Sequence, residues 1–178
     1  MELLISHEDI KQKIAEVARL IEKQYAGEEI TLLMVMKGAI CLTADLMREL
    51  NVSVNFEYIR ASSYGMRGIE RGALTVEGLD KIDIASKNIL LVDDIYDSGA
   101  TLSHIISECR KKTPKTLKTL VLLSKKVRRD LSYIPDYVLF EIENRFVVGF
   151  GLDYNEKYRG LRGIYLYKST EAKIVDSL

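Results

Sequence analysis

Short apolar runs alternate with stretches of helical periodicity along most of this 178-residue chain. The runs ITLLMVM (30–36) and NILLVDD (88–94) are almost continuously apolar, which is typical of strands buried on both faces of a sheet. A turn follows each run, and a helical stripe then begins near Ile40 and near Leu102. Strands that alternate with helices form βαβ units. We therefore expect an α/β fold with a central, mostly parallel sheet flanked by helices.

The rest of the chain fits the same alternation. Ser6 and Asp9 resemble a capping box, and apolar residues recur at helical spacing as far as Ile21, which predicts an N-terminal helix of about five turns. Further strands are predicted at 52–59, 117–124 and 136–142, and a shorter one at 146–152. From 61 to 83 the chain is polar and punctuated by glycine, and so long a stretch of weak structure indicates a functional flap.

Composition narrows the class of protein. With 47% hydrophobic residues, the chain has enough material for one core, so we expect a single domain over 1–178. Lys plus Arg (26) balances Asp plus Glu (26), so no net basic field attracts nucleic acid. No apolar run approaches the roughly 20 residues of a membrane span, and we expect a cytoplasmic protein without a membrane partner. Cys41 and Cys109 have no metal-ligand spacing and are interpreted as reduced core residues.

The segment LLVDDIYDSGATL (90–102) places polar residues where a buried strand ends, which is where open parallel sheets bind ligands. Ser98 to Thr101 lie where a loop enters a helix, so their N–H groups and hydroxyls suit a phosphate. Asp93 and Asp94 are hard oxygen groups suited to sugar hydroxyls and Mg²⁺, and Asp97 faces the same crevice. The alternative interpretation is that these are ordinary loop acids and a helix N-cap.

The segment VDDIYDSGATL (92–102) resembles the phosphoribosyl-pyrophosphate-binding signature of the type I phosphoribosyltransferases. Other segments match in the same order along nearly the whole chain: MKGA (36–39), SSYG (62–65), the lysine after the LVLLS strand, RFVVGFGLDYNE (145–156) and Arg159. The segment FVVGFGLDYNE (146–156) resembles the purine branch of this family, and the match as a whole is similar to its hypoxanthine-guanine members. The resemblance implies a type I phosphoribosyltransferase fold with a mobile flap at about 61–83 and a small hood built from the chain ends, its C-terminal part at about 145–178.

The same resemblance implies an enzyme of purine salvage. It would transfer the 5-phosphoribosyl group from phosphoribosyl pyrophosphate to hypoxanthine, guanine or both, giving IMP or GMP and pyrophosphate, with Mg²⁺ as cofactor. Asp93 and Asp94 would contact the ribose hydroxyls and organise the metal, to which Asp153 would also contribute. Asp97 would be the catalytic residue, near the purine N7. The ribose 5-phosphate would be held by Asp97, Ser98, Gly99, Ala100 and Thr101.

For pyrophosphate, the resemblance implies Lys37 and Gly38, with the peptide bond before the lysine able to be cis, and Arg159 as a second cation. Ser63 and Tyr64 match the part of the flap that closes over the site. Without the resemblance, Lys37-Gly38 is equally well a plain strand-to-helix turn, and Arg159 a solvated surface residue.

For the base, the resemblance implies that Lys125 donates to the oxygen at C6 of the purine. Phe146 and Ile95 would stack on the two faces of the ring, and the backbone at Val147 and Asp153 would read its edge. Two alternatives stay open here: the neighbouring Lys126 could take the place of Lys125 in the motif, and Phe146 could be a core residue.

Two competing functions and the oligomeric state also stay open. A regulator that senses phosphoribosyl pyrophosphate and controls nucleic acid is the main rival to an enzyme, since Lys125, Lys126, Arg128 and Arg129 form a local basic cluster. A phosphoribosyltransferase for xanthine or a pyrimidine is the second. The resemblance suggests a homodimer or homotetramer.

Overall fold

The computed structural model describes residues 1–63, 74–128 and 133–168. It contains the helices α1 (His7–Gln24), α2 (Ile40–Glu49) and α3 (Ala100–Lys111) and the short 3₁₀ helix η1 (Leu79–Lys81). The strands are β1 (Glu2–Ile5), β2 (Ile30–Met36), β3 (Val54–Ser63), β4 (Leu74–Glu77), β5 (Asn88–Tyr96), β6 (Thr116–Lys125), β7 (Tyr137–Ile142), β8 (Val147–Val148) and β9 (Ile164–Leu166).

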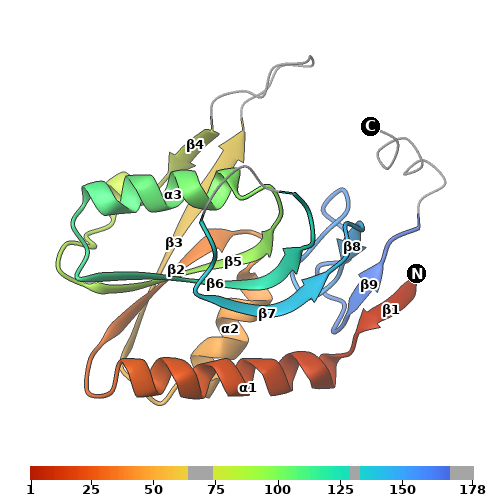
Figure 1. The fold of residues 1–178 in the computed structure, drawn as a ribbon, viewed down its shortest axis with the longest axis horizontal. Helices are drawn as coiled ribbons and strands as arrows, with labels where there is room; N and C mark the ends of the chain where they lie inside the picture. The colour runs from red at the N-terminus through yellow and green to blue at the C-terminus, as the bar shows by residue number, and fades with distance from the viewer. Residues whose placement is uncertain (64–73, 129–132, 169–178) are drawn as a thin grey trace.

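The central sheet has six strands in the order β4-β3-β2-β5-β6-β7. Five of these strands, β3, β2, β5, β6 and β7, are parallel to one another, and only the edge strand β4 is antiparallel. In Figure 1, α1 and α2 cover one face of this sheet and α3 covers the other. The predicted α/β fold with a mostly parallel sheet is confirmed.

Helix α1 forms as its sequence predicts. The Ser6 side chain accepts a hydrogen bond from the Asp9 N–H at 3.1 Å and so caps the first turn. The inward face is apolar and buried from Ile10 to Ile21, and it packs with α2 against the sheet. Among the described residues, no helix combines the length and the apolarity that a membrane span needs.

A smaller antiparallel sheet, β1-β9-β8, joins the two ends of the chain. We call these three strands the hood. Figure 1 shows the hood beyond the carboxyl ends of β5, β6 and β7. Because ligands of open parallel sheets bind at that edge, the hood and the sheet together frame the candidate site.

The structure corrects two of the expectations. The predicted strand at 146–152 is wrong beyond Val148, since the chain turns through positive φ at Gly149 (103°), Phe150 (49°) and Gly151 (100°). A Cβ on Gly149 would lie 2.2 Å from the Gly163 carbonyl oxygen, so only glycine fits this turn. The weak structure predicted for 61–83 is also wrong at both ends, which belong to β3 and to β4 with η1.

Candidate active site

A cavity of about 280 Å³ lies where β2 and β5 end and the loop before the last strand approaches them. Four segments that are separate in the sequence meet there, and most of its lining residues were predicted from the sequence. Those predicted residues are Lys37, Gly38, Asp93, Asp94, Ile95, Thr101, Asp153 and Arg159. The remaining lining residues are Val35, Met36 and Ala61.

Two adjacent carboxylates form the floor of the cavity at the end of β5. Asp93 is buried, and its Oδ1 accepts a hydrogen bond from the Asp94 N–H at 2.9 Å. Burial raises the pKa of Asp93, and the neighbouring Asp94 carboxylate raises it further. Burial also raises the pKa of Asp94. Such a pair gains most from a ligand that brings positive charge or hydroxyl donors.

Close contacts hold the predicted pyrophosphate loop, Lys37 and Gly38, against this floor. The Met36–Lys37 peptide bond is cis. A Cβ on Gly38 would lie 1.6 Å from Asp94 Oδ2, and a Cβ on Gly151 would lie 2.0 Å from the Gly38 carbonyl oxygen. Glycine at 38 therefore lets the Asp94 carboxylate approach the loop, and glycine at 151 lets two backbone segments approach more closely than a side chain would allow.

The predicted phosphate loop opens α3. Gly99 is the N-cap with φ of 83°, and no side chain caps the helix. The Ala100 N–H makes one long contact, 3.4 Å to Ser98 Oγ. Uncapped N–H groups at the start of a 12-residue helix suit a phosphate.

The two cations predicted for pyrophosphate share an anion. Glu156 accepts from Lys37 Nζ at 3.0 Å and from Arg159 Nη2 at 3.2 Å. Arg159 also pairs with Asp153 at 2.8 Å and donates to the Gly151 carbonyl at 2.7 Å. Its Nε is buried without a partner among the described residues. Lys37 and Arg159 thus lie near each other, as a pyrophosphate subsite requires.

The adjacent lysines Lys125 and Lys126 have different ion-pair partners. Lys125 Nζ lies 2.9 Å from Asp97 Oδ2, and the lysine side chain is only 13% exposed. Lys126 instead pairs with Glu143 at 3.1 Å and is 55% exposed. This arrangement favours Lys125 as the lysine that belongs to the site.

Phe146 is no core residue. Its side chain is 48% exposed, whereas Val147 and Val148 are buried. The ring meets Tyr154 and Tyr167 edge-on, with centroid distances of 5.8 and 5.9 Å. An exposed ring supported from behind by other aromatic rings is suited to stacking on a planar ligand.

The backbone of Val147 is oriented outward. The Phe146 carbonyl accepts from the Tyr167 N–H at 3.0 Å, and Val147 pairs with Leu166 one step further along the antiparallel ladder. Since hydrogen-bonded and non-bonded pairs alternate, the polar groups of Val147 point away from β9. β8 is an edge strand of the hood, so these groups have no partner strand within that sheet.

Some predicted residues lie outside the cavity itself. Asp97 and Lys125 lie beside it as a pair, and Ser98, Gly99 and Ala100 lie in the loop that leads from β5 into α3. Phe146 and Val147 belong to the hood side. Tyr64 lies outside the described residues, and of Ser63 only the backbone, at the end of β3, is described.

The carboxylates fit a hard cation that also takes oxygen atoms from its ligand. Asp93, Asp94 and Asp153 line one cavity and offer only oxygen donors, the type that Mg²⁺ prefers. Within the described ranges, no three His, Cys, Asp or Glu side chains are grouped closely enough to hold a metal by themselves. Mg²⁺ is commonly held by one or two carboxylates together with substrate phosphates and water, so the residues fit this ion.

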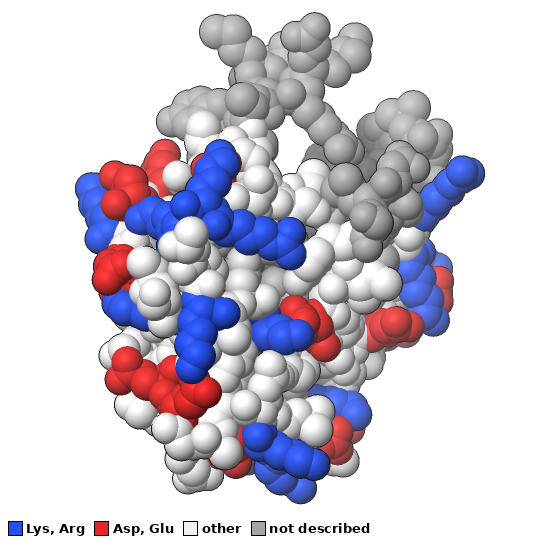
Figure 2. Space-filling model, turned by 60° about the vertical axis from the view of Figure 1, so that its left-hand side comes forward, with Lys and Arg blue, Asp and Glu red and all other residues white. Residues whose placement is uncertain are grey.

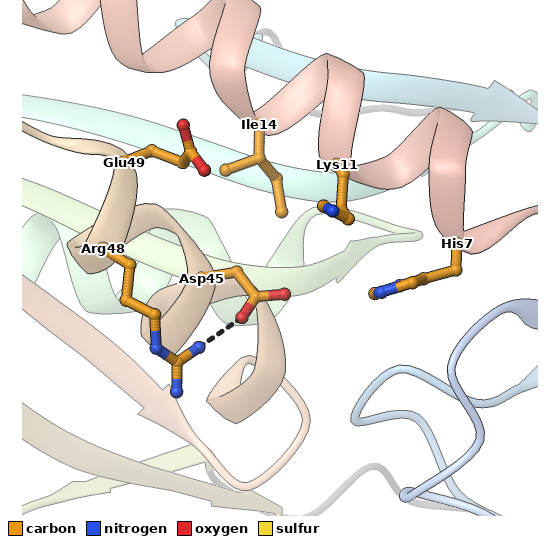
Figure 3. Close-up of a pocket in the computed structure, with 6 residues that line it drawn as sticks. All are labelled: His7, Lys11, Ile14, Asp45, Arg48 and Glu49. Atoms are coloured by element: carbon orange, nitrogen blue, oxygen red, sulfur yellow. Dashed lines mark hydrogen bonds and ion pairs between the residues drawn. The ribbon is translucent and has the colours of Figure 1, made fainter.

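Other surfaces carry less chemistry. A hollow of about 200 Å³ between α1 and α2 is lined by His7, Lys11, Ile14, Asp45, Arg48 and Glu49, none of which was predicted as a site residue (Figure 3). Arg48 pairs there with Asp45. On the face that Figure 2 draws, basic and acidic side chains are interspersed. This mixture gives no support to a nucleic-acid surface on that face.

The sequence interpretation missed two residues that organise the site. Glu156 links the two cations, and Gly151 makes room for the Gly38 carbonyl. The spacing of Glu156 and Arg159 is that of a local ion pair, which is a usable signal. Nothing in the sequence pattern indicates the partnership of Lys37 with Glu156, because 119 positions separate them.

Comparisons with known proteins agree with this geometry. A model of the phosphoribosyl transferase domain matches residues 3–155. The chain is 42% identical over 168 residues to a hypoxanthine-guanine phosphoribosyltransferase of Aquifex aeolicus, with 93% of this chain and 94% of that protein covered. A hypoxanthine phosphoribosyltransferase of Escherichia coli is 37% identical over 164 residues, with 90% and 92% covered.

Solved structures agree as well. A hypoxanthine phosphoribosyltransferase from Trypanosoma cruzi, in complex with the product IMP, matches with a TM-score of 0.86 at 36% identity and covers 94% of each chain. The predicted resemblance is therefore confirmed over most of the sequence and in the fold. The chain belongs to the type I phosphoribosyltransferase family, in its hypoxanthine-guanine branch.

Proposed function

We propose that the protein is a purine salvage enzyme that transfers the 5-phosphoribosyl group from phosphoribosyl pyrophosphate to hypoxanthine, guanine or both. The products are IMP or GMP and pyrophosphate. The observation that carries this proposal is the convergence of Lys37, Asp93, Asp94 and Arg159 on one cavity beside the uncapped start of α3. The relatives named for this activity, one of them solved with IMP, support the same assignment.

Each end of phosphoribosyl pyrophosphate has a matching subsite. The first-turn N–H groups of α3 and the hydroxyls of Ser98 and Thr101 hold the 5-phosphate. Asp93 and Asp94 accept from the ribose hydroxyls. Lys37 and Arg159, both near Glu156, receive the pyrophosphate. This arrangement fixes C1 of the ribose between the leaving group and the base.

The reaction breaks the bond between C1 and pyrophosphate, so negative charge grows on the departing oxygens while C1 becomes positive. Lys37 and Arg159 stabilise the departing charge. Mg²⁺, held by Asp93, Asp94 or Asp153 together with substrate oxygens, supplies further positive charge to the pyrophosphate when bound. Asp97 accepts the proton of the purine N7 or a hydrogen bond from it.

The purine is read by its oxygen at C6 and by its ring faces. Lys125 donates to that oxygen, and the exocyclic amino group of adenine in the same place would meet a cation instead of an acceptor. Phe146 and Ile95 contact the two faces of the ring. The outward-facing groups of Val147 and the backbone of Asp153 read the edge.

The Lys125–Asp97 ion pair at 2.9 Å indicates where the base binds in this site. Both side chains are assigned to the purine, one to C6 and the other to N7, which are adjacent positions on one edge of the ring. A bound 6-oxopurine therefore lies against both partners of an existing pair. The 2.9 Å distance between the two side chains supports their assignment to one edge of the ring.

Steady-state formation of nucleoside monophosphate tests the proposal. Phosphoribosyl pyrophosphate and Mg²⁺ are supplied with hypoxanthine, guanine, xanthine, adenine or orotate, for wild type, Asp97→Asn and the matched control Asp45→Asn. We expect turnover with 6-oxopurines that falls in Asp97→Asn and not in the control, since Asp45 lies on α2 and pairs with Arg48. Orotate as the preferred substrate would instead identify a pyrimidine enzyme.

The structure gives little support to the rival regulator, because two lysines of its basic cluster are paired with acids, Lys125 with Asp97 and Lys126 with Glu143. Tight binding of phosphoribosyl pyrophosphate without turnover for any base would select it. The homodimer or homotetramer suggested by the resemblance stays a prediction, which sedimentation analysis of the purified protein tests.

A further inference from the structure

Glu156 stands at the pyrophosphate subsite without a role in the proposed reaction. Its two carboxylate oxygens reach different cations, Oε1 to Lys37 and Oε2 to Arg159. Those cations come from segments 119 and 3 residues away in sequence. The glutamate therefore presents a bidentate anion to the same two groups that pyrophosphate would use.

The backbone at Glu156 is unusual for a glutamate. Tyr154 and Lys157 exchange both backbone hydrogen bonds at 3.1 Å, and the two residues between them have positive φ, 51° at Asn155 and 61° at Glu156. This is the pattern of a tight two-residue turn whose second central position favours glycine. A residue with a Cβ is disfavoured there, so local structure alone does not account for a glutamate.

The charges explain what the glutamate does. Without Glu156, the charges of Lys37 and Arg159 would be offset only in part, by acids already assigned to other roles, such as Asp153 beside Arg159 and Asp94 in the same cavity. With it, a further negative charge offsets the two cations in the free enzyme, and hydrogen bonds from Lys37 and Arg159 hold the pKa of Glu156 below its usual value. A bound pyrophosphate must displace this carboxylate from at least one of the two cations or accept its repulsion.

We propose that Glu156 is a built-in counter-anion that competes with pyrophosphate for Lys37 and Arg159. This inference rests on the proposed function, since it assigns that subsite to pyrophosphate. Glu156 weakens the binding of the diphosphate group, both in phosphoribosyl pyrophosphate and in the product. It thereby favours release of pyrophosphate after transfer.

The opposite role for Glu156 would be that of a brace, a side chain that positions Lys37 and Arg159 for pyrophosphate. An anion that merely held the two cations in place would strengthen pyrophosphate binding, and its removal would weaken it. The exposure of the pair argues against a brace, since Glu156 is 65% exposed and Lys37 52% exposed, and exposed ion pairs fix side chains only weakly. Repulsion between a glutamate and a multiply charged anion is the larger effect.

Two substitutions and one control separate these roles. Glu156→Gln removes the charge and keeps the shape, and Glu156→Gly removes the whole side chain with the residue that the turn favours. Glu16→Gln removes an equal charge from a lysine-paired glutamate of α1, where Glu16 lies 2.8 Å from Lys13. Inorganic pyrophosphate is titrated into each protein by calorimetry with Mg²⁺ present, after circular dichroism has compared their folds.

We expect the Kd for pyrophosphate to fall roughly fivefold in Glu156→Gln and in Glu156→Gly, and to stay unchanged in Glu16→Gln. In turnover, the KM for phosphoribosyl pyrophosphate falls in both Glu156 variants while the KM for hypoxanthine does not change. A Kd that is unchanged or raised in the Glu156 variants overturns the inference, as does the absence of pyrophosphate binding in every protein.

The titration also keeps the two proposals distinguishable. Wild-type protein that binds pyrophosphate but forms no nucleotide from any base removes the proposed function and leaves the effect of Glu156 measurable. Turnover with 6-oxopurines together with an unchanged Kd in the variants retains the function and removes the competition.

Discussion

The carboxylate of Asp94 lies against the backbone of Gly38, so closely that a Cβ on that glycine would be 1.6 Å from Asp94 Oδ2. The contact joins the loop after β2 to the floor at the end of β5. It couples the predicted pyrophosphate loop directly to a predicted ribose-binding acid. The position of one group therefore depends on the other.

Gly38→Ala should break this coupling. The new methyl group forces Asp94 or the loop to move, and displacements of about 1 Å at a reacting centre cost about 100-fold in rate. We expect kcat/KM for phosphoribosyl pyrophosphate to fall by about that factor in steady-state assays. Gly160→Ala is the matched control, because a Cβ there meets nothing within 4 Å. Equal activity in both variants would show that the contact has no functional weight.

The two adjacent lysines offer a second comparison. Lys125→Ala removes the donor that we assign to the purine oxygen, a charge-assisted hydrogen bond of about 2 kcal/mol, or roughly 30-fold in kcat/KM for hypoxanthine. Lys126→Ala removes only an exposed pair with Glu143, so little change is expected. Kinetics with varied hypoxanthine measure both. A larger loss in Lys126→Ala would reverse the assignment.

The buried acid at the end of β5 predicts opposite effects on stability and activity. Asp93 is only 7% exposed and adjoins a second carboxylate, so its charge is costly in the free protein. Asp93→Asn keeps an oxygen for the Asp94 N–H and removes the charge, which should stabilise the free protein by about 1 kcal/mol, or roughly 2–4 °C in Tm.

Calorimetric melting without substrate and turnover with substrate measure the two effects in the same preparation. We expect Asp93→Asn to melt at a higher temperature and to lose most of its activity. A lower Tm would mean that the ionised carboxylate has a favourable partner in the free protein.

Much of the fold follows from local pattern. The run at 30–36 became β2 with the predicted bounds, and the Ser6 cap begins α1, because a buried strand and a capped amphipathic helix each carry their signal within a few residues. The strands β4 and β9 were missed, since elements of 4 and 3 residues bury too little to leave a pattern. β9 also depends on pairing with β1, which comes from the other end of the chain.

The residues of the site also differ in whether the sequence predicts them. Asp93 and Asp94 were predictable because a strand end fixes where adjacent side chains go. The exposed Phe146 was ambiguous, because an apolar residue before two buried valines reads equally well as core. The ion pair between Lys37 and Glu156 could not be predicted from the sequence, since only the folded chain brings the two residues together.

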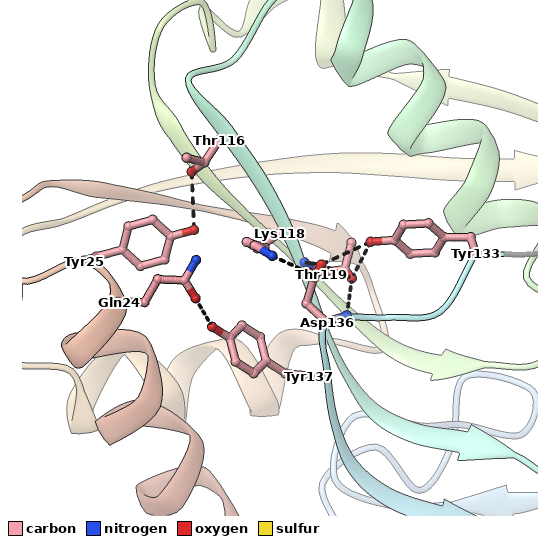
Figure 4. Close-up of polar contacts among 8 residues, drawn as sticks. All are labelled: Gln24, Tyr25, Thr116, Lys118, Thr119, Tyr133, Asp136 and Tyr137. Atoms are coloured by element: carbon pink, nitrogen blue, oxygen red, sulfur yellow. Dashed lines mark hydrogen bonds and ion pairs between the residues drawn. The ribbon is translucent and has the colours of Figure 1, made fainter.

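A polar cluster behind the site gives a stability prediction with a defined pH range (Figure 4). Asp136, just before β7, accepts from Lys118 Nζ at 2.7 Å, from the Thr119 N–H at 2.9 Å and from the Tyr133 hydroxyl at 3.2 Å. Burial alone would raise the pKa of Asp136, but the Lys118 ammonium and the Thr119 N–H outweigh it, and the pKa is lowered.

A carboxyl whose pKa is lower in the folded state stabilises the fold above its unfolded pKa and loses that contribution as the pH falls through its folded pKa. Asp136→Asn should therefore reduce the unfolding free energy by about 1–3 kcal/mol near neutral pH. The difference from wild type should shrink as the pH falls below 3.8, the ordinary value for aspartate. Urea unfolding across that range measures it, with Asp45→Asn as control, since the Asp45 side chain is 30% exposed and pairs with Arg48 on the surface of α2. A difference that persists unchanged to the lowest pH at which the protein still folds would mean that the charge of Asp136 is not what joins β6 to the start of β7.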